Sequence, residues 1–201
     1  MNAMLRDQDQ PIWDAALPWL DVRCNDEHTL IAYSIAKALI HLRPEAQADI
    51  ILPAILLHDV GWKTVPEDKL AGCVGPKPIY PDLVVQHEKE GARIARDILS
   101  RRTDIDVEAV AAIIDGHDTR KHALSLDDAV VKDSDKLWRF TDHGVRTIAS
   151  WLNQTIPETT AMVAEFVPRT LLTDEGRVMA AAFVAEQEGM LSLVGVRGRK
   201  G

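Results

Sequence analysis

Apolar residues recur along this chain at helical spacing, and no segment shows the alternation of a half-buried strand. Between residues 26 and 42, for example, the apolar stripe consists of Ile31, Ile35, Leu39 and Leu42. The pattern predicts an all-α fold, a single-domain helical bundle. The expected helices cover residues 13–22, 26–42, 45–61, 82–101, 103 or 104 to about 116, 125–140, 143–153, 157–166 and 171–191.

Residues that cap or interrupt helices divide these segments. Asp82 and Ser125 each stand directly before an apolar stripe, where such side chains typically accept hydrogen bonds from the first helical N–H groups. Residues 72–81 contain two glycines and three prolines, so we expect a loop there. This loop could border a functional site, with Tyr80 contacting a ligand, or it could be a stiff surface connector. Residues 197–201 should form a frayed tail.

Length and charge narrow the class of protein. A chain of 201 residues with 46% hydrophobic positions suits one domain, residues 1–201, with a sizeable core. The formal net charge of -8 argues against general nucleic-acid or membrane-surface binding. The longest apolar run, Ile50–Leu57, is too short to span a bilayer, and residues 1–10 lack the apolar core of a signal peptide. We therefore expect a cytoplasmic protein whose two distant cysteines are reduced.

Four histidines recur at nearly equal intervals. His28, His58, His87 and His117 are separated by 30, 29 and 30 residues, which is about one helix and one turn. Two of them fall near helix starts and two near helix ends. In an up-and-down bundle, the start of one helix and the end of the next lie at the same level. The spacing therefore predicts that all four imidazoles meet in one layer of the core.

Buried imidazoles without partners are unfavourable, by about 1–3 kcal/mol for each unsatisfied polar group. A shared metal ion is the simplest partner for four of them, because neutral imidazole is a common metal ligand. Carboxylates complete the set of candidate ligands. Asp59 directly follows His58, and Asp135 lies on the expected helix 125–140. The alternative is a set of ordinary core histidines.

The order of these residues resembles a known family. His28, the pair His58-Asp59 and then Asp135 are similar to the four-ligand signature of the HD-domain superfamily of metal-dependent phosphohydrolases. The contexts LLHDVG at 56–61 and DSDKLWRF at 133–140 resemble that family's motifs. His87 and His117, with HEKEGARIARDIL at 87–99, match the six-ligand, two-metal branch. The resemblance covers a core of about 22–145, to which C-terminal helices at about 143–191 are added.

The resemblance implies two divalent metal ions that share a carboxylate. The first metal would bind His28, His58, Asp59 and Asp135, and the second would bind His87, His117 and Asp59. Iron or manganese is expected first, because nitrogen and carboxylate ligands suit these ions; zinc, cobalt, nickel and magnesium are the alternatives. A metal-bound hydroxide would then attack the phosphorus of a small phosphate ester or nucleotide.

Three basic residues are candidates for binding the substrate. Lys136 resembles the basic residue that follows the family's last aspartate, and it would bind the substrate phosphate and assist catalysis beside Asp59. Arg23 precedes the first ligand helix. Lys63 is the weakest candidate, because many family members place a lysine one position earlier. Each could instead be a solvated surface residue. Asp118 could orient its neighbouring histidine or face solvent.

Two other functions fit the same ligands. Di-iron oxygenases of this superfamily, such as myo-inositol oxygenase, use the same ligand order to activate dioxygen. A non-catalytic binding module with a structural metal is the third interpretation, and closed coordination would favour it. The sequence leaves the oligomeric state open.

Overall fold

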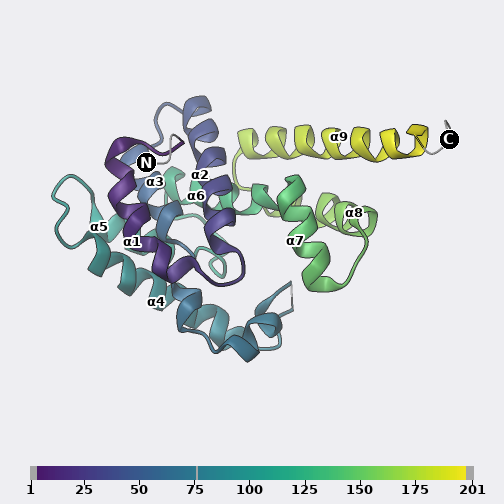
Figure 1. The fold of residues 1–201 in the computed structure, drawn as a ribbon. Coiled ribbons are helices and arrows are strands. Elements are labelled where there is room, and N and C mark those ends of the chain that lie inside the picture. Colours follow the sequence, from purple (N-terminus) through teal and green to yellow (C-terminus); the bar gives the residue numbers. More distant parts are fainter. Residues whose placement is uncertain (1–3, 76, 198–201) are drawn as a thin grey trace.

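The computed structural model describes residues 4–75 and 77–197 of the chain. These residues form α-helices and short 3-10 helices joined by turns, with no strand among them, which confirms the all-α prediction (Figure 1). The α-helices are α1 (Gln10–Leu20), α2 (Asn25–Leu42), α3 (Ala48–Leu57), α4 (Pro81–Leu99), α5 (Val107–Ile114), α6 (Leu126–Leu137), α7 (Asp142–Leu152), α8 (Ile156–Phe166) and α9 (Asp174–Arg197). The 3-10 helices are η1 (Asp7–Asp9), η2 (Val60–Thr64), η3 (Glu67–Cys73), η4 (Trp138–Phe140) and η5 (Pro168–Thr170).

Helix α3 is the centre of the bundle. Its residues from Ile51 to Leu57 are all buried, and a helix that is apolar on every side is stable only when neighbours surround it. It packs against α1, α2, α4, α5 and α6. Since His58 and Asp59 follow directly from its last turn, they emerge in the middle of the protein.

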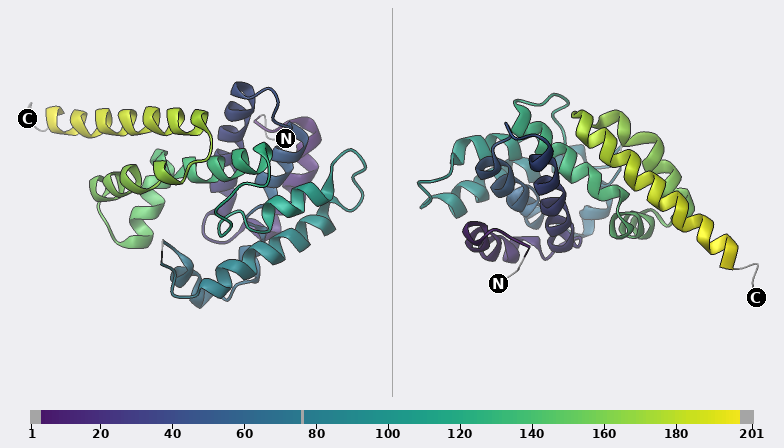
Figure 2. Two further views of the ribbon diagram at one scale, coloured as in Figure 1. Left: turned by 180° about the vertical axis from the view of Figure 1, so that it is seen from behind. Right: turned by 90° about the horizontal axis from the view of Figure 1, so that it is seen from above.

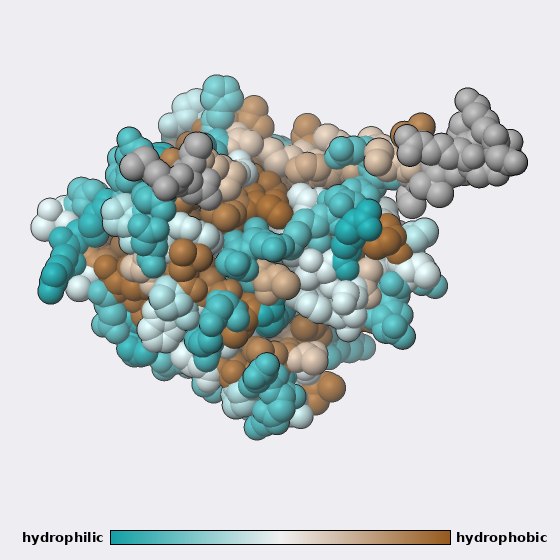
Figure 3. Space-filling view, in the orientation of Figure 1, coloured by the Kyte–Doolittle hydropathy of each residue, from teal (hydrophilic) through white to brown (hydrophobic). Residues whose placement is uncertain are grey.

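The C-terminal helices form a smaller layer beside this core. Helices α7 and α8 pack against each other and against η4, and α9 contacts α2, α6 and α8 before it extends past the rest of the molecule (Figures 1 and 2). Val178, Met190 and Leu193 are exposed on α9, and apolar colours follow the projecting helix in the space-filling view (Figure 3).

Several predicted helix boundaries need correction. Ser125 caps α6 as expected, accepting a hydrogen bond from the N–H of Asp128 at 3.2 Å. Asp82 does not cap α4, which starts one residue earlier at Pro81; proline suits a first helical position because its φ is already fixed and it has no N–H to leave unpaired. Asp106, not residue 103 or 104, caps α5 by accepting from Ala109.

Three further segments differ from expectation. The helix predicted at 45–61 ends at Leu57, and the chain then turns into η2. Gly72 and Cys73 belong to η3 and Pro81 begins α4, so the irregular part of the expected 72–81 loop is 74–75 and 77–80; residue 76 lies outside the described residues. Helix α9 extends to Arg197 instead of ending near 191, and the rest of the expected tail, 198–201, also lies outside the described residues.

Two simpler expectations can be compared with the structure. Cys24 and Cys73 are both free. Among the described residues, no helix is both long enough and apolar enough to cross a membrane.

Candidate metal centre

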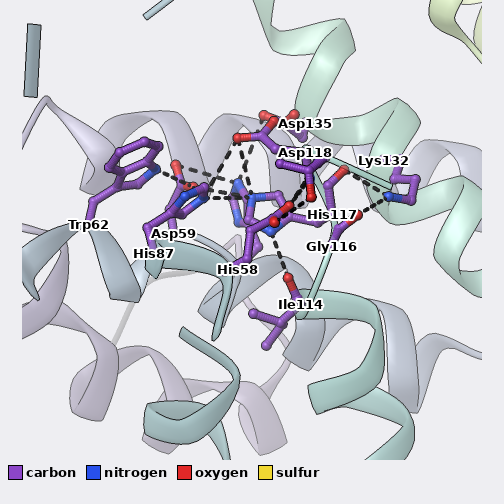
Figure 4. Close-up of polar contacts among 12 residues, drawn as sticks. His58, Asp59, Trp62, His87, Ile114, Gly116, His117, Asp118, Lys132 and Asp135 are labelled. Carbon is purple, nitrogen blue, oxygen red and sulfur yellow. Dashed lines mark hydrogen bonds and ion pairs between the residues drawn. The ribbon is translucent and has the colours of Figure 1, made fainter. Parts of the chain in front are cut away.

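The four evenly spaced histidines come together in the core. His28 lies in the first turns of α2 and His87 in the first half of α4, whereas His58 and His117 follow the ends of α3 and α5. All four are buried. The alternation of helix starts and helix ends therefore brings the imidazoles to one level, as the spacing predicts; three of them appear in Figure 4.

The two histidines at helix ends have a fixed tautomer. The Nδ1 atoms of His58 and His117 lie 2.8 Å from the carbonyl of Ile55 and 2.9 Å from that of Ile114. A carbonyl only accepts hydrogen bonds, so each Nδ1 carries the hydrogen and donates it. In the neutral ring the Nε2 atom then keeps its lone pair, which is the form that binds a metal.

A first group of donor atoms gathers around the Nε2 atoms of His28 and His58, which are 3.0 Å apart. Asp135 Oδ1 lies 3.4 Å from the former and 3.9 Å from the latter. Asp59 Oδ2 is 3.6 Å from both. Atoms that each lie about 2.1 Å from one ion are separated by roughly 3–3.5 Å, so this first group has the spacing that a single cation requires.

A second group faces the other oxygen of Asp59. The Nε2 atoms of His87 and His117 are 3.5 Å apart, and Asp59 Oδ1 lies 4.0 Å and 3.5 Å from them. Asp118 Oδ2 joins the group at 3.7 Å and 3.9 Å. Because Oδ2 of Asp59 faces the first group and Oδ1 faces the second, this carboxylate can bridge two ions.

The turn after α3 fixes Asp59 in this bridging position. Trp62, in η2, donates from Nε1 to Asp59 Oδ1 at 3.0 Å (Figure 4). Its ring also stacks on the ring of His87, with centroids 3.8 Å apart. Gly61 makes the close approach possible, since a Cβ there would collide with the backbone carbonyl of His87. The glycine of the LLHDVG motif thus lets η2 pack directly on α4.

Burial and charges within the cluster set the protonation states of the candidate ligands. Burial lowers the pKa of His28 and of His87 to about 4, so both rings are neutral at pH 7. Burial alone would raise the pKa of Asp59, but the neighbouring His58 and His117 hold it well below its usual range. Burial also opposes protonation of His117, yet its hydrogen bond with Asp59 raises its pKa to about 10. A metal at this ring would displace that proton.

Asp135 is ionised for a similar reason. Burial opposes its charge, but Arg139 and His28 lower its pKa to about 2. Arg139 Nη2 lies 3.4 Å from Asp135 Oδ2, the oxygen that does not face the first group. The described residues thus supply buried nitrogen and carboxylate donors, a set that fits divalent cations.

The turn that carries His117 is held from two sides, and Glu88 holds the first. Its buried carboxylate accepts from the N–H groups of Asp118 and Thr119, both at 2.8 Å, and from the Thr119 hydroxyl at 2.6 Å. Glu88 directly follows His87 on α4. One helix therefore provides a candidate ligand and fastens the turn that provides the next.

Lys132 holds the same turn from the other side. Its buried ammonium group donates to the carbonyls of Gly116 and His117 at 2.6 and 2.9 Å (Figure 4). It also donates to the carbonyl of Arg120 at 3.1 Å. Gly116 adopts a positive φ of 100°, which exposes these carbonyls to one donor and which only glycine adopts readily. We call Glu88 and Lys132 the turn clamp.

The three basic residues predicted to bind substrate each have a different partner in the structure. Lys136 donates from Nζ to the carbonyl of Thr170 at 3.0 Å, and burial lowers its pKa. Lys63 pairs with exposed Asp21 at 2.6 Å and makes no described contact with the cluster. The Arg23 guanidinium lies over the ring of Trp62, 4.3 Å from its centroid.

Sequence reasoning missed several residues of this centre. The sequence is compatible with either of two roles for Asp118, and it does not single out Glu88, Lys132 or Arg139. One signal for Arg139 was present, because it lies four residues after Asp135 and thus on the same helix face. His143 accepts a hydrogen bond from Trp138 Nε1 at 3.0 Å and contacts Glu27 Oε2 at 2.6 Å.

Comparison with known proteins gives one match. The family model of the HD domain matches residues 25–139, a range that covers more than half of the chain and includes both groups of candidate ligands. No curated protein and no solved structure matches the chain. The chain belongs to the HD domain family.

Proposed function

We propose that this protein is a metal-dependent phosphohydrolase that cleaves a small phosphate ester or nucleotide. The observation that carries the proposal is the position of Asp59, whose two oxygens face two separate groups of buried nitrogen and oxygen donors. Membership of the HD domain family supports metal-dependent phosphohydrolase chemistry in general. The two groups favour the two-metal form of that chemistry.

Two divalent ions, iron or manganese first, would supply positive charge at the phosphoryl group and lower the pKa of an attacking water. His28, His58 and Asp135 would hold the first ion, and His87 and His117 the second, with Asp59 shared between them. Asp118 extends the second set beyond the ligands that the sequence predicts. Its side chain is 30% exposed, so it lies where the buried centre meets solvent.

Basic residues beside the centre would position the substrate. Arg139 contacts Asp135 through one long hydrogen bond, and its side chain is 31% exposed. The remaining N–H groups of its planar guanidinium can donate to phosphoryl oxygens. Lys136 adds positive charge on the same helical segment. Lys63 is engaged with Asp21 and contributes least to the proposed site.

The experiment compares metal-loaded proteins on a panel of phosphate esters and nucleotides. The wild-type protein, stripped with a chelator and reloaded with Mn²⁺ or Fe²⁺, should release phosphate only after reloading. His58→Ala should release none, because it lacks a ligand of the first group. His122→Ala is the matched control, since this histidine is exposed, and it should behave as wild type.

Two results would contradict the proposal. One is the absence of phosphate release from the whole panel, or equal release by His58→Ala. The other is metal-dependent oxygen consumption by the iron-loaded protein without phosphate release, which would identify an oxygenase with the same ligands.

A further inference from the structure

A cavity of about 240 Å³ lies between η3 and α7. Its lining combines one cation, one exposed carboxylate and an apolar wall. The lining residues are Arg23, Glu67, Leu70, Ala71, Val74 and Trp151. The apolar wall suits the carbon skeleton of a small molecule, and Arg23 is the only basic group that lines the cavity.

Arg23 has no anionic partner among the described residues. Its guanidinium lies between two indoles, 4.3 Å from the ring centre of Trp62 and 5.0 Å from that of Trp151. Its Nη1 atom is buried and makes no hydrogen bond. A buried charged donor without an acceptor is unfavourable, and the two rings replace only part of its lost hydration. The group is therefore positioned to receive an acceptor.

The backbone holds this arginine in an unusual conformation. Arg23 and Cys24 have φ values of 57° and 58°, two consecutive non-glycine residues in the left-handed region. Such a conformation persists only where the surroundings enforce it, and it is common at binding sites. It directly precedes α2, whose first turns carry His28.

Only aromatic rings separate Arg23 from the candidate metal ligands. On one side, Trp62 contacts Arg23 and stacks on His87 at 3.8 Å. On the other, the Trp151 ring lies 6.2 Å from that of Trp138, which meets His28 edge-on at 4.6 Å. The cavity therefore lies on the far side of these rings from the metal centre, and its Arg23 is one ring away from His87.

We propose that this cavity is an anion subsite in which Arg23 binds a second anionic group, a carboxylate or a phosphate, of the substrate. The ester phosphate of the same molecule lies at the metal centre, and its carbon skeleton contacts Leu70 and Val74. Glu67 accepts a hydrogen bond from a hydroxyl group at the rim. The identity of the ligand as a substrate rests on the proposed function, whereas anion binding by Arg23 does not.

Anion binding to the metal-free protein tests the subsite directly, because bound metals then make no contribution. Malonate and inorganic phosphate are titrated separately at constant ionic strength, with tryptophan fluorescence and calorimetry as readouts. At least one anion should bind saturably to the wild type. Arg23→Met should weaken that binding by about tenfold or more, since a charge-assisted hydrogen bond is lost. Arg23→Lys should bind with intermediate affinity, because it keeps the charge without the planar fork.

Arg101→Met is the matched control, because Arg101 is exposed and does not line the cavity, and this variant should bind the anions as the wild type does. Equal binding by Arg23→Met, or no saturable binding of either anion to the wild type, overturns the subsite. If the anions bind through Arg23 but no ester is hydrolysed, the proposed function fails and the subsite stands. If esters are hydrolysed without such binding, only the subsite fails.

Discussion

The two groups of candidate metal ligands are built in different ways. In the first group, His28 and Asp135 project from the regular helices α2 and α6, and these helices pack against each other. In the second group, His117 and Asp118 lie on a turn beyond the end of α5. Helix packing fixes the backbone of the helical ligands, whereas ligands on a turn need other hydrogen bonds that hold the backbone.

The turn clamp provides those hydrogen bonds. Glu88 satisfies two N–H groups of the turn, and Lys132 satisfies three of its carbonyls. Both charged groups are buried, which is favourable only because nearly all of their hydrogen-bonding capacity is used. The comparison predicts that the second group is the more sensitive of the two to changes outside its ligands.

The largest effect should come from the residue that both groups share. Asp59→Ala removes the only carboxylate whose oxygens face both groups, so bound metal should fall from roughly two equivalents to less than one, with phosphate release reduced to background. Elemental analysis of the purified protein measures this. Asp97→Ala, at an exposed pair on α4, is the control. Full metal content in Asp59→Ala would show that the groups do not depend on a bridge.

Removal of one ligand from the second group should show whether the two groups bind metal independently. His87→Ala leaves the first group intact, so roughly one of two metal equivalents should remain. Elemental analysis of this variant measures how many metal equivalents remain, and His122→Ala is analysed in parallel as the control. Loss of both metals would mean that the groups bind only as a unit.

Loss of the turn clamp should weaken metal binding by the second group, although no ligand side chain is changed. Lys132→Met leaves three carbonyls without their donor, so the free energy of unfolding should fall by about 3 kcal/mol, and the second metal should bind about 10–100-fold more weakly. Denaturant unfolding and metal titration measure the two effects. Lys121→Met, at an exposed lysine, should change neither. Equal weakening of both metals would contradict the comparison.

A smaller effect is expected at a residue that shares helix α2 with His28 but lies outside the metal centre. Tyr33 lies on α2 with His28, and its hydroxyl donates to Asp9 Oδ2 at 2.6 Å. Burial, assisted by that hydrogen bond, raises the pKa of Tyr33 from 10.0 to about 12. The unfolded chain loses this proton first, so the stabilisation is complete below pH 10 and is lost as the pH rises to about 12.

Alkaline titration of near-ultraviolet absorbance in Tyr80→Phe, which leaves Tyr33 as the only tyrosine, should show the raised midpoint. Tyr33→Phe should reduce the free energy of unfolding by about 1 kcal/mol and leave the metal content of both groups unchanged. A normal midpoint would show that the N-terminal segment does not enclose this hydroxyl.

Much of the fold follows from local pattern. The apolar stripes of α2 and α6 and the capping side chain of Ser125 are short-range signals, and they predict those helices closely. The predicted start of α5 is wrong because several polar residues precede its apolar stripe. Any of them could cap the helix, and the sequence does not show that Asp106 is the one that does. Helix α9 extends past its predicted end, because it continues through Gly189 and Gly195 to Arg197 although glycine often ends a helix.

The candidate site, too, has a part that local pattern predicts and a part that it does not. The order of histidines and aspartates, set by helix length, was enough to predict which side chains meet. The clamp could not be predicted, because Lys132 reaches a turn that only tertiary packing brings beside α6. Resemblance points to Lys136 as the basic residue of the site and does not point to Arg139. Neighbouring positions on a helix point about 100° apart, so Lys136 does not share the face of Asp135, whereas Arg139 does.

Gly61 has a consequence for how the separation of two bound ions is set. Without a side chain at this position, main chain rests on main chain where η2 meets α4. The separation between Asp59 and His87 is therefore set by contact between two backbone segments. The positions of backbone segments vary less than the rotamers of side chains do. We therefore expect the tolerance of the centre for ions of different radius to depend on a residue that has no side chain with which to coordinate them.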